Sequence, residues 1–373
     1  MALHVFTSSV AAPGVQATLA DGEDLFVAAN VIVASTDTSA VIGGGSNHRA
    51  EIYGSVLSNF IGLDIGNSDT DVNNVIVVRA TGLVQEFSQD GAAIRMRGTG
   101  SILDNRGEIH SQDFGVLMGS NGTGISKIIN SGLIEAADAR AIVRFGSSTE
   151  TISTVNTGTI RGVTASYDGK LSALGKDLIT NNGKMFGDII LGAGDDTYKG
   201  TNGRLTGKVL GGDGKDTLLG GIDHDKMSGG IGDDALTGGA GNDTLAGDEG
   251  IDTLYGGLGK DTLTGGTGKD TFIFKAIGES TVATSGRDII KDFSRAQADK
   301  IDLSAIDAST KLSGNQEFKF IQTEAFHKVA GELRFQIVSG DTIISGDVNG
   351  DGKADFSIAL DLSLVMKGTD FLL

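Results

Sequence analysis

Seven aspartates recur every nine residues between Gly211 and Ile273, and each follows a glycine-rich tetrad. The repeated unit reads G-G-x-G-x-D-x-U-x, where U is a large apolar residue. The aspartates are Asp216, Asp225, Asp234, Asp243, Asp252, Asp261 and Asp270. Carboxylate and backbone carbonyl oxygens are the ligands of Ca²⁺, which takes about six to eight of them, and nonapeptides of this form are calcium-binding repeats. The spacing therefore predicts a series of calcium sites.

The same nine residues encode the turn and the strand that must position each aspartate. The G-G-x-G-x-D segment predicts a tight turn, because glycine adopts positive φ and lets the backbone approach an ion closely. The x-U-x segment predicts a very short strand with an inward-pointing apolar residue: Leu218, Met227, Leu236, Leu245, Leu254, Leu263 or Phe272. Two units would complete an 18-residue coil, so that carboxylates 18 residues apart would face one gap.

The repeat block is too acidic and has too few apolar residues to fold without cations. Residues 211 to 273 contain 12 Asp and Glu against 4 Lys and Arg, a local net charge of −8. One buried apolar side chain contributes about 1.5–3 kcal/mol, whereas each ordered residue gives up about 1–2 kcal/mol of backbone entropy. We therefore expect Ca²⁺ to supply the missing stabilisation.

A second, longer repeat precedes the first. An Asn-x-Gly triplet begins at Asn105, Asn130, Asn156 and Asn181, the glycines are 25, 26 and 25 residues apart, and short β-rich runs surround each copy. A period of this length, with Gly and Asn at the corners, is typical of stacked coils in a parallel β-helix. We expect the four asparagines to stack as an internal ladder of side-chain amides.

These patterns predict an all-β chain. A right-handed parallel β-helix with coils of about 25 residues would continue into a calcium-binding parallel β-roll with 18-residue coils, followed by a β-rich C-terminal cap. The predicted boundaries are residues 1–190 for the β-helix, 191–273 for the β-roll and 274–373 for the cap.

Composition excludes several classes of partner and of location. The 373 residues carry a net charge of −18 and contain no cysteine, and a chain without clusters of Lys and Arg is unsuited to bind nucleic acid. No run of 18 apolar residues is present, so we expect no membrane span. The N-terminal residues lack the basic and apolar regions of a cleavable signal peptide, so export would use another route or would not occur.

The seven nonapeptides resemble the calcium-binding repeats of the repeats-in-toxin (RTX) family of proteins secreted by type I systems. In that family one turn provides the carbonyls of positions 2 and 4 and its Asp, and the turn two units later provides the carbonyls of positions 1 and 3 and its own Asp. The resemblance implies about five sandwiched Ca²⁺ ions. The first would be held by Gly212, Gly214, Asp216, Gly229, Ile231 and Asp234.

Four further ions would use the Asp pairs 225 with 243, 234 with 252, 243 with 261, and 252 with 270. The other residues implied as ligands are Asp196, Gly221, Asp223, Gly238, Ala240, Asp248, Gly250, Gly256, Gly265 and Thr267. Asp223 and Asp248 replace glycines of the repeat, which is expected to strain their turns.

The segment from Gly286 onward is similar to the C-terminal region of serralysin-type secreted proteins, through patches such as Arg287-Asp-Ile-Ile-Lys-Asp-Phe293. The resemblance implies that this part caps the β-roll and carries an export signal read by type I secretion machinery. The closing residues Asp370-Phe-Leu-Leu373, an acid followed by apolar residues, fit that interpretation.

Asp347, Asn349 and Asp351 alternate before Gly352 with the spacing of an EF-hand-like loop. The twelfth position is Ile358 rather than the bidentate Glu. A plain hairpin turn and a calcium site therefore both remain open.

Two function classes compete. Serralysin-like zinc proteases need H-E-x-x-H, which none of the five histidines begins. A non-catalytic secreted protein, such as an adhesin or biofilm-matrix component that binds a cell surface or extracellular polysaccharide, fits best. The alternative is a polysaccharide lyase, epimerase or glycosidase, with an active face on the β-helix built from Asp90, Arg95, Arg97, Asp104, Glu108, His110 and Asp113.

Overall fold

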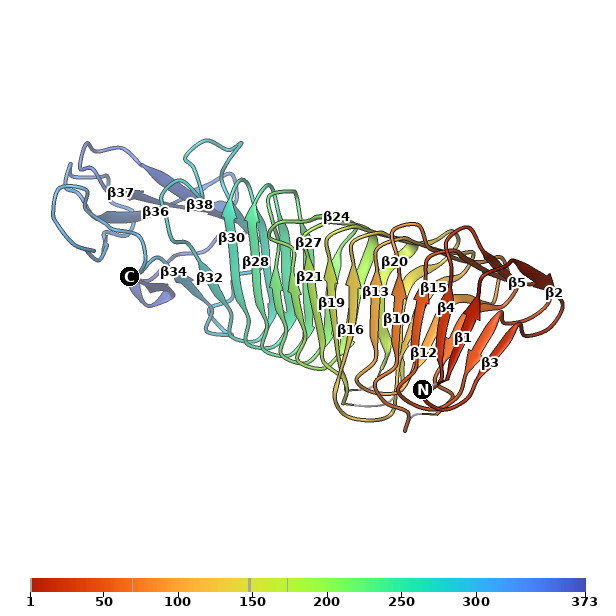
Figure 1. Ribbon diagram of the computed structural model, residues 1–373. Coiled ribbons are helices and arrows are strands. Elements are labelled where there is room, and N and C mark those ends of the chain that lie inside the picture. Colours follow the sequence, from red (N-terminus) through yellow and green to blue (C-terminus); the bar gives the residue numbers. More distant parts are fainter. Residues whose placement is uncertain (1, 69, 147–148, 173) are drawn as a thin grey trace. The chain divides into compact units, whose positions relative to one another are not determined.

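The computed structural model describes residues 2–68, 70–146, 149–172 and 174–373, and nearly all of its regular structure is β-strand (Figure 1). The all-β prediction is confirmed. The chain divides into two compact units, Met1–Gly212 and Asp213–Leu373, called here the first and the second unit. The division at residues 190 and 273 stays a prediction.

The first unit is a stack of parallel strands in three columns. One column pairs in the order β1 (Leu3–Phe6), β4 (Asp24–Val27), β7 (Arg49–Ile52), β10 (Val75–Val78), β13 (Ile102–Asn105), β16 (Ile125–Asn130), β19 (Thr151–Asn156), β21 (Asp177–Asn181) and β23 (Thr197–Lys199). The second is β2 (Val10–Ala12), β5 (Ile32–Ser35), β8 (Ser55–Ser58), β11 (Leu83–Glu86), β14 (Glu108–Ser111), β17 (Leu133–Ala136), β20 (Thr159–Ser172), β22 (Lys184–Ala193) and β24 (Arg204–Thr206).

The third column is β3 (Ala17–Leu19), β6 (Val41–Gly43), β9 (Ile61–Ile65), β12 (Ala92–Arg97), β15 (Phe114–Gly119) and β18 (Arg140–Gly146), continued by the long β20 and β22 and by β25 (Val209–Asp213). Alternate residues of these strands point inward. Ile109, Ile134 and Ile160 lie in register on adjacent strands and are fully buried. Stacked aliphatic side chains of this kind form the core of the unit.

The predicted asparagine ladder is present on the inner side of the turns. The side-chain Nδ2 of Asn105 donates to Oδ1 of Asn130 at 2.7 Å, Asn130 donates to Asn156 at 2.8 Å, and Asn156 donates to Asn181 at 2.9 Å. All four side chains are fully buried. Each of the first three also donates to the backbone carbonyl three residues beyond its partner. The ladder thus satisfies polar groups of the turns inside an apolar core.

Replacement of Asn130 by Ala is expected to destabilise the first unit by about 3 kcal/mol, because an unpartnered buried amide costs about 1–3 kcal/mol and both neighbours in the ladder lose a bond. Urea unfolding in saturating calcium measures the effect. Asn182→Ala, one residue beyond the ladder and exposed, is the matched control and should cost less than about 0.5 kcal/mol. Equal effects of the two variants would contradict a stabilising ladder.

The second unit contains two columns of short parallel strands. One is β26 (Thr217–Leu219), β28 (Ala235–Ala240), β30 (Thr253–Leu258), β32 (Thr271–Ile273), β34 (Lys300–Asp302) and β39 (Phe371–Leu372). The other is β27 (Lys226–Ile231), β29 (Thr244–Glu249), β31 (Thr262–Thr267), β33 (Ile289–Ile290) and β38 (Phe356–Leu360). Leu218 pairs with Leu236, and Leu236 with Leu254, so the coil is 18 residues long as predicted. All seven predicted apolar residues of the repeats are buried.

The C-terminal segment completes the second unit with antiparallel strands. β36 (Glu332–Val338) pairs with β37 (Asp341–Asp347), and β37 pairs with β38. The remaining elements are β35 (Lys319–Phe320) and the 3-10 helix η1 (Gly368–Asp370). Asp370 is buried and accepts a hydrogen bond from Nε of Arg295 at 2.7 Å, and Phe371 is also buried.

Within the described ranges, no helix combines the length and the hydropathy that crossing a membrane would require.

Candidate calcium-binding site

The turns of the second unit bring the predicted aspartate pairs together. Oδ1 of each Asp accepts the backbone N–H of the Asp 18 residues earlier, at distances of 2.7 to 3.0 Å, for the pairs 216 with 234, 225 with 243, 234 with 252, 243 with 261 and 252 with 270. All seven aspartates are buried. These repeated contacts form two carboxylate ladders, one on each side of the coil.

The second carboxylate oxygen points to a cation. In Asp234, Asp243, Asp252, Asp261 and Asp270, Oδ2 is buried and has no hydrogen-bond partner. A buried polar atom without a partner costs about 1–3 kcal/mol, and more when it is charged. A divalent ion bound beside each of these five oxygens would supply the missing partner.

Glycine at position 1 leaves room for that ion. A methyl group built on Gly238 would lie 2.2 Å from Oδ2 of Asp243 and 2.6 Å from the carbonyl oxygen of Gly256 in the next coil. The same cradle recurs at Gly229 and Gly247, where the carboxylate contacts would be 2.2 and 2.3 Å. A carboxylate and a carbonyl from successive coils therefore converge over each glycine, and this donor set suits Ca²⁺.

The glycines at positions 2 and 4 allow the turns to stack closely. Gly257 and Gly259 have φ of 99° and 136°, conformations that side chains disfavour. A methyl group on Gly259 would lie 1.6 Å from the carbonyl oxygen of Gly241 in the preceding coil. Backbone carbonyls of successive coils thus lie one above the other at these positions.

Two of the predicted position-3 carbonyls also bond between coils. The carbonyl of Ile231 accepts the N–H of Gly214 at 2.7 Å, and that of Thr267 accepts the N–H of Gly250 at 2.8 Å. Each keeps a second lone pair. The predicted position-1 residues Gly238, Gly256 and Gly265 supply carbonyls that converge on the carboxylates of Asp225, Asp243 and Asp252, whereas ligation by the full predicted set stays a prediction.

The two aspartates that replace glycines behave differently. Asp248 adopts φ of 76° in the left-handed region, as the glycines at this position do, whereas Asp223 is not among the residues with positive φ. Gly221 also lacks a positive φ, so the turn that contains Asp223 departs from the others. Strain is thus seen at Asp248 and avoided at Asp223.

Substitution of Asp248 by Gly is expected to raise the free energy of unfolding of the second unit by about 1 kcal/mol, since the left-handed conformation costs a side chain roughly 1–2 kcal/mol. Urea unfolding in saturating calcium reports this gain. Asp223→Gly removes the same charge without relieving a positive φ and should give no gain. A loss of stability in Asp248→Gly would show that the carboxylate of Asp248 matters more than its backbone conformation.

Burial makes these carboxylates costly to ionise. It raises the pKa of Asp243 and Asp252 to about 7 and that of Asp234 and Asp270 to about 6. The backbone N–H bonds lower these pKa values in part, and neighbouring carboxylates raise them further. A positive charge between the coils would reverse this penalty.

The ladders extend beyond the nonapeptides, which the sequence analysis missed. The N–H of Asp261 donates to Oδ1 of Asp288 at 2.8 Å, and the N–H of Asp270 donates to Oδ1 of Asp299 at 3.1 Å. Asp292 accepts the N–H groups of Gly265 and Gly266 at 2.9 and 2.7 Å. The missed signal is an Asp two residues before a buried apolar residue, as in Asp288-Ile-Ile290. The C-terminal segment therefore covers the last repeat turns, as predicted for a cap.

In the loop after β37, the acidic and amide side chains accept hydrogen bonds from the loop's own backbone N–H groups. Asp347 accepts the N–H groups of Gly350 and Gly352 at 2.6 and 2.8 Å, and Asn349 accepts the N–H of Asp351 at 2.8 Å. Asp355 accepts the N–H groups of Val348 and Asn349. Both the hairpin-turn and the calcium interpretation of this loop stay open.

Among the described residues, no group of three or more His, Cys, Asp or Glu side chains converges as a metal cluster. Carbonyl donors are therefore essential to any calcium site in this protein.

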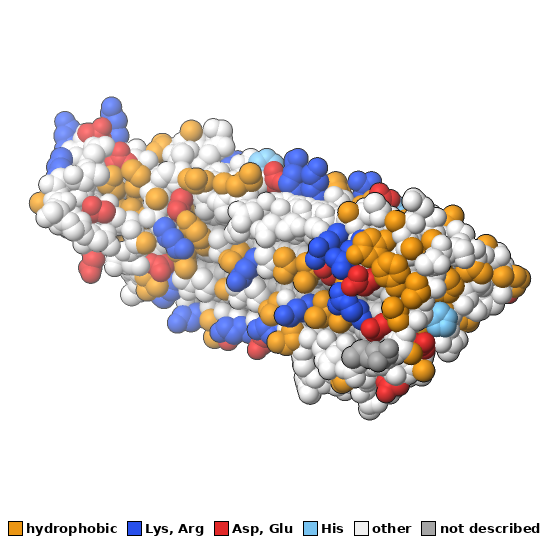
Figure 2. All heavy atoms as spheres, viewed as in Figure 1, with side chains coloured by type: hydrophobic (Ala, Val, Ile, Leu, Met, Phe, Trp, Pro, Cys, Tyr) orange, Lys and Arg blue, Asp and Glu red, His pale blue; other side chains and the backbone are white. Residues whose placement is uncertain are grey.

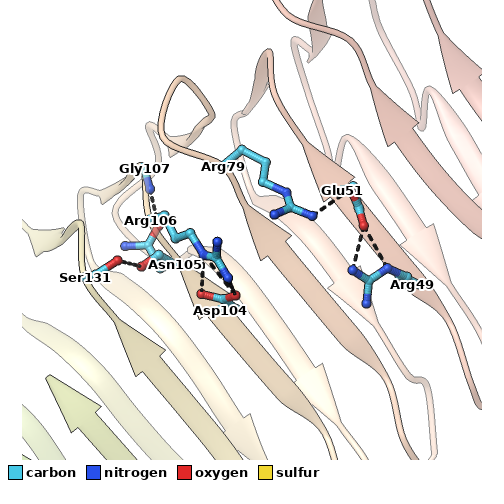
Figure 3. Close-up of polar contacts among 8 residues, drawn as sticks. All are labelled: Arg49, Glu51, Arg79, Asp104, Asn105, Arg106, Gly107 and Ser131. Atoms are coloured by element: carbon cyan, nitrogen blue, oxygen red, sulfur yellow. Dashed lines mark hydrogen bonds and ion pairs between the residues drawn. The ribbon is translucent and has the colours of Figure 1, made fainter. Parts of the chain in front are cut away.

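Polar residues on the outside of the first unit pair with one another. Glu51 lies between Arg49 and Arg79 at 2.6 and 3.0 Å (Figure 3). Arg106 folds over Asp104, with Nη2 2.6 Å from the carboxylate. Figure 2 shows basic, acidic and hydrophobic side chains mixed over the visible face.

The residues of the alternative enzyme hypothesis are only partly brought together. His110 contacts Glu108 at 3.0 Å and Glu135 at 3.2 Å, and Arg95 donates to Oδ1 of Asp64 at 2.8 Å. Burial, followed by the nearby Asp90, raises the pKa of Asp113. Asp104 pairs with Arg106 and lies on β13, whereas His110 lies on β14 and Arg95 on β12, and these three strands belong to three different columns. The predicted residues therefore do not form one site.

Comparison with known proteins concerns mainly the C-terminal half. Residues 173–373 match the family described as Peptidase M10 serralysin C terminal. Among solved structures, the R3 subunit of a mannuronan C5-epimerase from Azotobacter vinelandii is 28% identical over 40% of this chain and 78% of its own, with a TM-score of 0.29. The R2 subunit is 27% identical over 44% of this chain and 91% of its own, with a TM-score of 0.31. None of the curated proteins matches the chain.

Proposed function

The chain belongs to the family described as Peptidase M10 serralysin C terminal, and we propose on this basis that it is a secreted, non-catalytic RTX protein that folds on extracellular calcium after type I export. The observation that carries the proposal is the series of buried Oδ2 atoms without partners, of which those of Asp234, Asp243 and Asp252 lie beside a carbonyl of the next coil. Bound Ca²⁺ would supply the positive charge and the coordination bonds that these oxygens lack.

Calcium would couple folding to location. Extracellular modules bind Ca²⁺ with dissociation constants of about 10⁻⁴–10⁻³ M, so the repeats would stay unfolded where calcium is scarce and fold where it is millimolar. An ion that binds only the folded state stabilises that state by mass action. We propose that the folded chain then serves at the cell surface or in the surrounding matrix, with the first unit displaying a binding face.

Calcium removal tests this function. After exhaustive dialysis against EGTA, far-ultraviolet circular dichroism of the whole chain should show a large loss of β-structure, and added CaCl₂ should restore it cooperatively. MgCl₂ at the same concentration is the control, because Mg²⁺ is smaller and gives up its water reluctantly. A chain that remains fully ordered in EGTA would refute the proposal.

One observation favours the alternative of a polysaccharide-active enzyme. A depression of about 250 Å³ in the first unit is lined by Arg95, Arg97, Phe114, Leu117, Val143 and Phe145. Guanidinium groups beside aromatic rings suit a carboxylated sugar. Incubation with a panel of acidic polysaccharides, followed by assays for new unsaturation and reducing ends, tests this alternative, and products that disappear in Arg97→Gln would support it over the non-catalytic role.

A further inference from the structure

A step of the carboxylate ladder lies in the first unit, outside every nonapeptide. The N–H of Asp177 donates to Oδ1 of Asp196 at 2.6 Å. This is the bond that joins Asp216 to Asp234 in the repeats. Asp177 is fully buried, and the sequence around it lacks the G-G-x-G-x-D pattern.

The environment of Asp177 reproduces the cradle of the repeats. Its Oδ2 is buried and accepts no hydrogen bond of normal geometry, although the buried hydroxyl of Tyr167 lies close enough to Asp177 to interact with it. A methyl group built on Gly169 would lie 2.4 Å from this oxygen and 2.1 Å from the carbonyl oxygen of Leu191 in the next coil. At Gly220 the corresponding distances, to Oδ2 of Asp225 and to the carbonyl of Gly238, are 2.5 and 2.3 Å. Leu191 precedes Asp196 by five residues, as Gly238 precedes Asp243.

The opposite side of Asp177 is closed by a side chain of the protein. Nη1 of Arg144 lies 2.5 Å from Oδ1 of Asp177, and Nη2 donates to the carbonyl of Glu150. Arg144 is 1% exposed. In the repeats, Oδ1 accepts the N–H of the Asp one coil earlier. At Asp177 the guanidinium of Arg144 takes that place.

Several buried acidic groups lie at this position. Glu150 is also buried, and its carboxylate accepts the hydroxyl of Ser120 at 2.9 Å and that of Ser126. Arg144 pairs with Asp177, and the carboxylate of Asp196 accepts the N–H of Asp177. Buried charges are stable only when they are paired or bound to metal.

We infer that Asp177 Oδ2 and the Leu191 carbonyl hold a calcium ion in the first unit, with Arg144 closing the other side of Asp177. This inference rests on the proposed function. Its consequence is that the first unit depends on calcium near its C-terminal end, although its sequence there contains no repeat of the nonapeptide type.

Counting bound ions by native mass spectrometry tests the site. The double variant Arg144→Gln/Asp177→Asn removes both members of the buried ion pair together, because Asp177→Asn alone would leave the guanidinium without its carboxylate. Titrated with CaCl₂, it should bind one ion fewer than the wild type. Asp195→Asn, in the same turn as Asp196 but exposed, should bind the wild-type number.

Circular dichroism in saturating calcium establishes whether each variant folds. If the double variant does not, Gly169→Ala keeps all charges, places a methyl group in the cradle and should also lose one ion. A wild-type count in the folded double variant, or in Gly169→Ala, would overturn the inference. A wild type that binds no calcium would instead refute the proposed function, so the two failures are distinguishable.

Discussion

Replacement of Asp234 by Asn should raise the calcium concentration for half-maximal folding by roughly tenfold or more. Asp234 takes part in two predicted sites, through its contacts with Asp216 and with Asp252. Calcium affinity depends on the number of charged ligands, and a loss of about 1.4 kcal/mol corresponds to a factor of ten in affinity. A calcium titration followed by circular dichroism gives the midpoint.

The neighbouring residue provides the matched control. Asp233 is exposed, so Asp233→Asn removes the same charge from the same turn without touching the ladder. Its midpoint should stay within about twofold of the wild type, since an exposed charge is screened by water and salt. Equal midpoints for the two variants would mean that net charge, rather than ligation, governs folding.

The two variants should also differ in the absence of calcium. Asn at position 234 removes a buried carboxylate whose pKa is about 6 and which is costly to charge at pH 7.5. In EGTA, Asp234→Asn should therefore be no less ordered than the wild type, although it is less stable in calcium. A variant that loses stability to the same extent in both conditions would point to a packing defect.

Acidification should act in opposite directions with and without calcium. Asp243 and Asp252 have folded-state pKa values of about 7, whereas an unfolded Asp has a pKa of about 3.9. The metal-free folded state therefore binds more protons than the unfolded state. This contribution to stability is fully present below about pH 4 and is lost as the pH rises through about 6–7.

In EGTA, lowering the pH from 7.5 to 5.5 should thus increase β-structure. In calcium, protons compete with the ion, and the midpoint of the titration should rise at least about tenfold over the same interval. Calorimetry in buffers of different ionisation enthalpy should detect proton release on calcium binding at pH 6.5. A midpoint that is independent of pH would show that the ladder carboxylates do not change protonation when calcium binds.

Strict periodicity made much of the fold predictable from sequence. The apolar residue of every nonapeptide is buried, and each Asp contacts the Asp 18 residues away, because stacked coils of equal length bring equivalent positions into register. The asparagine ladder was predictable for the same reason. Repetition converts one local pattern into many tertiary contacts.

Contacts that break the period were not predictable. Asp261 and Asp288 are 27 residues apart, and Asp270 and Asp299 are 29 apart, so inserted residues conceal the equivalence. The pairing of Arg144 with Asp177 joins residues 33 apart on neighbouring coils, and nothing local marks either residue. Such contacts depend on loop lengths, which vary where coils of one size give way to another structure.

Anomalous X-ray diffraction from crystals grown in CaCl₂ tests the central claim most directly. The predicted result is a row of calcium peaks between successive turns, each next to Oδ2 of a ladder aspartate and the position-1 carbonyl of the following coil. Ordered turns with no anomalous peak beside Asp234, Asp243 and Asp252 would contradict the account.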